Sequence, residues 1–130
     1  MTEYTKVNLR DVEDMAPKFG FAPDLESRFA RKALELENSG LSYFKVTPDF
    51  RVPFGHTHSE QEEVYLVIAG NARVKLDDDV VDLATWDAIR IPPGTMRGIE
   101  GGSDGAEILA FGAPNIENKD VEMSQGWWSD

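Results

Sequence analysis

The sequence predicts an all-β fold, a closed sandwich or barrel built from short strands. Apolar runs of four to seven residues recur at regular spacing along most of the chain, and Gly and Pro turn signals separate them. The chain has 130 residues. A chain of this length is expected to form one domain and to bury roughly two-thirds of its unfolded surface. We therefore expect one β-domain with its own core.

Residues 1–28 are expected to form a short N-terminal arm, in which Pro and Gly residues interrupt any long helix. The apolar residues within 7–12 fit either a short strand or a turn of helix. Asp24 is a good N-cap, so a second short helix can begin there. Residues 29–36 stay ambiguous, because their Ala, Leu and Glu favour helix while their neighbours favour a hairpin.

The barrel itself is expected over residues 29–112. The expected strands are 41–46, 63–69, 71–76, 80–83, 88–91, 96–99 and 106–111. Gly70 is expected to end the strongest strand, and residues 100–105 are expected to form a loop. The polar tail, residues 113–130, carries Trp127 and Trp128. Both indoles require burial, either on their own barrel or on a second subunit.

Charge and composition exclude several classes of function. The chain has 24 Asp and Glu against 13 Lys and Arg, a net charge of −11, which argues against nucleic acid or anionic lipid as partner. No apolar stretch reaches the length of a membrane span, and the charged N-terminus is unlike a secretory signal, so we expect a cytoplasmic protein. With no Cys, any metal must be held by His, carboxylate, amide or backbone groups.

The chain contains two histidines, His56 and His58, one residue apart. In a strand, residues i and i+2 face the same side about 6.6 Å apart, so both imidazoles can converge on one point. Glu62 and Glu63 follow shortly after, and two imidazoles with one carboxylate make a facial set of ligands suited to Fe(II), and also to Mn, Ni or Zn. The alternative is that both histidines are exposed loop residues, because their small polar neighbours suit a loop.

The segment around this pair resembles the first motif of the cupin superfamily. In that motif His-x-His is followed after three or four residues by Glu and, six residues later, by Gly. His56 and His58 match, Glu63 follows after four residues, and Gly70 follows after six more. Glu62 fits only the shorter spacing and then misses the Gly by one residue, so Glu63 is the expected ligand.

Pro92-Pro93-Gly94 stands where the second cupin motif has Pro-x-Gly. The resemblance covers roughly residues 40–112. It implies a double-stranded β-helix, or jelly-roll, barrel like that of small single-domain bacterial cupins. It also implies a metal or ligand pocket inside the barrel and often a homodimer.

The main departure from the family is Arg97, which stands where the third metal-binding His is usual. Arg cannot donate a lone pair to a metal. Three outcomes are open: the metal is kept with Arg97 turned aside, Arg97 pairs with Glu63 in a metal-free pocket, or Arg97 binds an anionic substrate group beside a metal. Gln61 and Glu62 are candidates for an additional ligand.

Four residues are candidates for substrate binding: Arg97, Tyr65, Trp86 and Met96. Core packing is the alternative for Tyr65 and Trp86. The fold and these residues together favour a barrel pocket for a divalent metal and a small, in one version anionic, molecule. A metal-dependent dioxygenase-type oxidoreductase is the first interpretation and a sugar or keto-acid isomerase the second. A non-catalytic, metal-free binding protein is the third.

Overall fold

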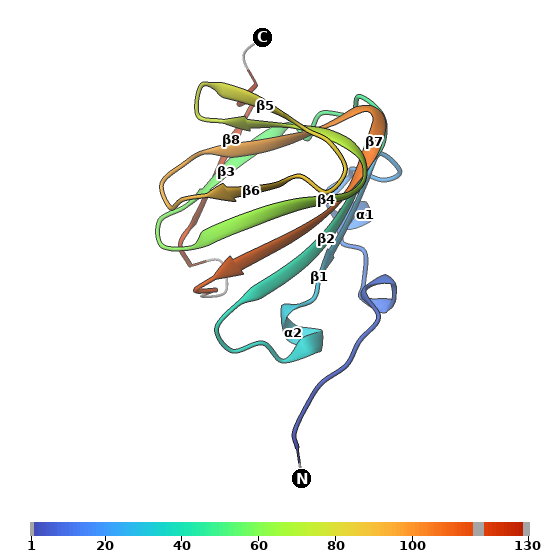
Figure 1. Cartoon of the computed structure of the whole chain (residues 1–130), viewed down its shortest axis with the longest axis vertical. Coiled ribbons are helices and arrows are strands. Elements are labelled where there is room, and N and C mark those ends of the chain that lie inside the picture. The colour runs from blue at the N-terminus through green and yellow to red at the C-terminus, as the bar shows by residue number, and fades with distance from the viewer. Residues whose placement is uncertain (1, 116–118, 129–130) are drawn as a thin grey trace.

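The computed structural model of this protein describes residues 2–115 and 119–128. Over these residues eight strands form one curled antiparallel sheet, so the all-β jelly-roll prediction is confirmed (Figure 1). The strands are β1 Leu25–Phe29, β2 Gly40–Val46, β3 Phe54–His58, β4 Glu62–Leu76, β5 Asp79–Leu83, β6 Ala88–Ile91, β7 Arg97–Ala113 and β8 Val121–Gln125. The helical elements are the 3-10 turn η1 Leu9–Asp11, α1 Ala16–Phe19 and α2 Arg31–Leu34.

Two long strands, β4 and β7, pair over most of their lengths and form the centre of the barrel (Figure 1). The predicted break at Gly70 and the predicted loop over 100–105 are both wrong, because β4 and β7 each continue as one strand through these positions. The pairing shifts register there, from Gly70 with Ala106 to Ala72 with Gly101, so that residues 102–105 of β7 bulge out of the β4–β7 ladder. Gly70 and Gly105 both have a φ of +71°, and a Cβ on Gly70 would collide with the Gly105 carbonyl oxygen. The glycines therefore bend the strands at a bulge instead of ending them.

The remaining strands close the sheet on both sides of this pair. β1 pairs with β2 and β2 with β7, while β8 pairs with β3, which touches β7 at His56 and Arg97. A helix beginning at Asp24 is wrong: residues 25–29 form β1, with Leu25 and Ser27 buried. Along this segment every second residue faces the core, which suits a strand and not a helix.

The core lies between the facing strands of the barrel. Its fully buried apolar side chains alternate along β4 and β7, as the two-residue period of a strand requires. They include Val67, Val74 and Ile108, and Ile91 on β6 joins them. Among the described residues, no helix is both long enough and apolar enough to cross a membrane.

The C-terminal segment returns to the barrel as β8, and the two tryptophans follow it. The Trp128 Nε1 donates to the Val52 carbonyl oxygen at 3.0 Å, and the Arg51 guanidinium lies 4.2 Å from the Trp128 ring centroid. Trp127 lies against Lys75, whose Nζ is 4.1 Å from its ring centroid. Both indoles therefore contact the barrel of their own chain.

Candidate metal centre

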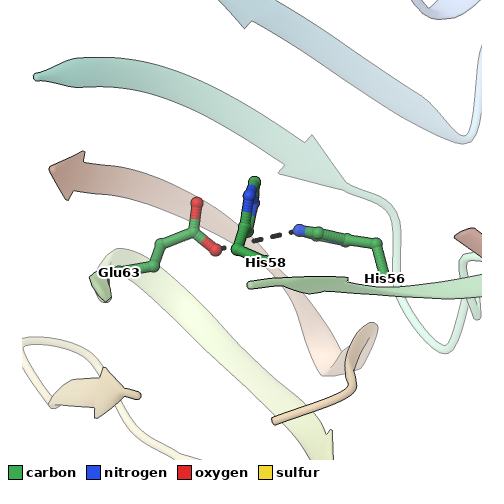
Figure 2. Close-up of side chains that lie close together, drawn as sticks. All are labelled: His56, His58 and Glu63. Atoms are coloured by element: carbon green, nitrogen blue, oxygen red, sulfur yellow. Dashed lines mark ion pairs between the residues drawn. The ribbon is translucent and has the colours of Figure 1, made fainter. Parts of the chain in front are cut away.

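The centre is built where β3 ends and β4 begins. His56 and His58 lie on β3, and a turn of three residues leads to Glu63 on β4. One ligand atom from each side chain lies within 4.8 Å of the other two (Figure 2). The two imidazole rings meet edge to face, with centroids 5.1 Å apart. The structure thus brings together the three residues that the sequence spacing singles out.

Glu63 lies close to both His56 and Arg97. Its Oε1 lies 3.8 Å from His56 Nε2 (Figure 2) and 3.4 Å from Arg97 Nη1. Burial acts to raise the pKa of Glu63, but the adjacent His56 and the charges of Arg97 and His58 outweigh it and lower this pKa. The carboxyl group is therefore an anion at neutral pH, the form that a cation requires.

Asp120 holds the second histidine in place. Its Oδ1 lies 3.1 Å from His58 Nδ1, and its Oδ2 accepts the backbone N–H groups of Glu60 at 3.2 Å and Gln61 at 3.0 Å. Burial acts to raise the pKa of Asp120, but the hydrogen bonds from His58, Gln61 and Glu60 lower it. As an anion, Asp120 accepts the Nδ1 proton of His58 and leaves Nε2 with a free lone pair.

Arg97 lies on β7 as the cross-strand partner of His56, and 0% of its surface is exposed. Its Nη1 donates to Glu63 and its Nη2 to the Pro92 carbonyl oxygen, both at 3.4 Å. Its buried Nε has no hydrogen-bond partner within the part of the chain that the structure describes. Of the three arrangements open from the sequence, the structure has Arg97 paired with Glu63.

A cavity of about 320 Å³ adjoins the two histidines and Glu63, a size at the lower end of the range for small-molecule sites. Tyr65, a predicted substrate contact, lines it and is 1% exposed. Burial, together with the neighbouring Glu63 carboxylate, raises the pKa of Tyr65, so its hydroxyl stays neutral.

The other predicted substrate contacts lie away from the cavity. Arg97 is not among its lining residues. Trp86 is 71% exposed in the turn after β5, where its φ of +74° turns the chain. Met96 also lies outside the lining, and its backbone N–H donates to Asp77 at 3.0 Å.

The two candidates for an additional ligand differ in position. Gln61 is buried, lines the cavity and donates through Nε2 to the Pro114 carbonyl oxygen at 3.3 Å. Glu62 is exposed and pairs with Arg90 at 2.7 Å on the outer face. The alternation of β4 sends Glu62 and Glu63 to opposite faces.

The chemistry of this donor set fits a divalent first-row metal. Two neutral imidazoles and one carboxylate are preferred ligands of such ions. Two bonds of about 2.1 Å can join donors up to about 4.2 Å apart, and His56 and Glu63 already lie 3.8 Å apart. These three residues would hold such an ion beside the cavity that they line.

The chain was compared with known proteins. A family model described as Cupin domain matches residues 42–110. The uncharacterized protein MJ1618 of Methanocaldococcus jannaschii is 32% identical over 69 residues, which are 52% of this chain and 55% of that protein. The chain therefore matches only about half the length of this relative.

Solved structures share the fold at low identity. A cupin protein from Bacteroides fragilis has a TM-score of 0.71 at 22% identity, covering 90% of this chain and 89% of its own. Oxalate decarboxylase from Bacillus subtilis has a TM-score of 0.77 at 21% identity, and the match covers 96% of this chain and 32% of that one. A Streptomyces PAC13 variant with uridine has a TM-score of 0.76 at 16% identity, and the match covers 98% of this chain and 95% of that one. At these identities the likeness shows the fold alone.

Proposed function

The chain belongs to the cupin domain family, and from this premise we propose that it binds a divalent metal ion through His56, His58 and Glu63. The ion would serve a reaction on a small molecule held in the adjoining cavity. The convergence of these three donors on the cavity wall is the observation that carries the proposal. Candidate metals are Fe, Mn, Ni and Zn.

The neighbouring residues support this assignment. Asp120 fixes the ring of His58 through Nδ1, and Glu63 supplies the negative charge that an ion needs. Arg97, which is not among the residues lining the cavity, donates a hydrogen bond to Glu63. When bound, a divalent ion polarises a carbonyl or hydroxyl oxygen as a Lewis acid, and iron or manganese adds redox chemistry. Dioxygenase-type oxidation is the first proposed reaction and isomerisation of a sugar or keto acid the second.

A metal-free binding protein is a second candidate, favoured by one observation. The guanidinium of Arg97 already neutralises part of the charge of Glu63, and its positive charge disfavours a second cation nearby. In this version His56 and His58 would hydrogen-bond a ligand directly.

A chelator-competition titration with Mn²⁺, Ni²⁺ and Zn²⁺ separates the two candidates. Wild-type protein without a His tag is compared with Glu63→Gln and with the control Glu62→Gln, which makes the same change on the opposite face of β4. We expect Glu63→Gln to weaken binding at least tenfold and Glu62→Gln to leave it unchanged. No measurable binding of any of the three ions by the wild-type protein would favour the metal-free candidate. Measurable but equal affinities for all three proteins would contradict Glu63 as a ligand.

A homodimer and a cytoplasmic location, which the sequence and the family resemblance favour, remain proposals. Light scattering of the purified chain tests the first of them. A mass of 14.5 kDa, that of a single chain, would contradict it.

A further inference from the structure

The cavity beside the metal centre is lined mostly by apolar side chains. Apart from the two histidines and Glu63, its polar lining residues are uncharged, and they include Ser27, Ser42, Gln61 and Asn115. Five phenylalanines from separate parts of the chain line it. They are Phe19, Phe21, Phe29, Phe44 and Phe54. Two contacts join them in pairs, Phe21 with Phe54 at 5.8 Å and Phe29 with Phe44 at 5.9 Å between ring centroids. Paired rings of this kind form a wall that suits a planar or bulky apolar body.

The open side of the cavity is also aromatic. Phe19 is 53% exposed and Phe29 is 47% exposed, although both line the cavity. Leaving these rings in water costs free energy that an apolar ligand would recover by covering them. The cavity thus has an apolar rim as well as an apolar wall.

The charge inside the cavity selects against anions. Among the described residues that line it, none is Lys or Arg, and Glu63 contributes a carboxylate. The nearest guanidinium, that of Arg97, is fully buried and already bonded to Glu63 and Pro92. Because Arg97 is already paired with Glu63, a carboxylate or phosphate on the ligand would lose its hydration without gaining a cation among these lining residues.

We infer that the ligand of this barrel is a neutral molecule with an aromatic or similarly bulky apolar body and one polar donor group. The body lies against the phenylalanines, and the donor group points toward His56 and His58. The placement of the donor group rests on the proposed metal-dependent function, whereas the neutral apolar character rests on the cavity alone. This inference departs from the anionic substrate that Arg97 suggests in the sequence.

The test uses two probes with one ring system, neutral 2-naphthol and anionic 2-naphthoate. Their binding to the full chain at neutral pH is measured by calorimetry in the presence of chelator. We expect 2-naphthol to bind at least tenfold more tightly. Equal or tighter binding of 2-naphthoate, or no detectable binding of 2-naphthol, would overturn the inference.

Two matched variants locate the site. Phe29→Ser removes a ring at the rim, and Phe111→Ser removes a ring that is 41% exposed and does not line the cavity. We expect Phe29→Ser to weaken 2-naphthol binding about tenfold and Phe111→Ser to leave it unchanged. Equal effects of the two would overturn the placement. Repeating the titration without chelator and with Zn²⁺ keeps the two proposals separate: absent zinc binding counts only against the metal centre, and absent probe preference only against the ligand class.

Discussion

Replacing Asp120 with Asn should weaken metal binding while leaving the barrel folded. The carboxylate of Asp120 accepts from His58 Nδ1 at 3.1 Å and from two backbone N–H groups. In Asp120→Asn, the single amide oxygen can still accept both backbone groups. The amide NH₂ then faces Nδ1 and favours the tautomer with the proton on Nε2. That proton occupies the lone pair that the metal would use.

The expected magnitude follows from what the substitution removes. His58 is 7% exposed, so little water is available to replace the lost acceptor. Losing the partner that orients a metal-binding His typically costs 10- to 100-fold in affinity, about 1.4–2.7 kcal/mol. We expect this loss of affinity for Asp120→Asn. The unfolding temperature of the metal-free protein should stay close to that of the wild type.

Chelator competition measures the affinity, and thermal unfolding checks the fold. Glu122→Gln is the control, because Glu122 lies two residues away on β8, is exposed, and undergoes the same loss of charge. Wild-type affinity in Asp120→Asn, or an equal loss in Glu122→Gln, would refute the positioning role.

Three further predictions concern other parts of the barrel. Arg97→His should tighten metal binding about tenfold or more, because it removes a buried cation beside Glu63 and adds a ligand; unchanged affinity by calorimetry would contradict this. Burial and the adjacent Glu107 carboxylate raise the pKa of Tyr43, so in the folded state its hydroxyl keeps its proton where the unfolded chain loses it. Tyr43 should therefore contribute its full stabilisation below about pH 10, and the free energy of unfolding should fall as pH rises above that value. In Tyr43→Phe, denaturant titrations should show a shallower alkaline decline of this free energy. Gly55→Ala should lower the free energy of unfolding by about 1–3 kcal/mol, because the new methyl would lie 2.6 Å from Trp127 Cδ1; an undiminished cost when Trp127→Ala is added would show that this contact is not the cause.

The metal ligands could be predicted from the sequence because their geometry is local. The i, i+2 spacing of His56 and His58 fixes one face of β3, and Glu63 follows after a single turn. Asp120 was missed because 62 residues separate it from His58, and no spacing rule relates the two. A carboxylate near the end of a tail that also carries two tryptophans was the only available signal, and it is weak.

The strands and the cavity show the same limit. Glycine usually marks a turn, so the sequence predicts a strand end at Gly70. Only the pairing of Gly70 with Ala106 on β7 shows that β4 continues through it. The aromatic wall combines rings that precede β1 with rings on β1, β2 and β3. Its composition therefore depends on the closure of the barrel, which no local pattern describes.

The metal content of the untagged protein shows whether His56, His58 and Glu63 bind an ion. The protein is loaded separately with Fe(II), Mn(II), Ni(II) and Zn(II), freed of excess ion and measured by elemental analysis beside a His56→Ala, His58→Ala double variant. We expect about one ion per chain for at least one metal and none in the double variant. Clearly less than one ion per chain for every metal, or the same content in the double variant, would contradict this expectation.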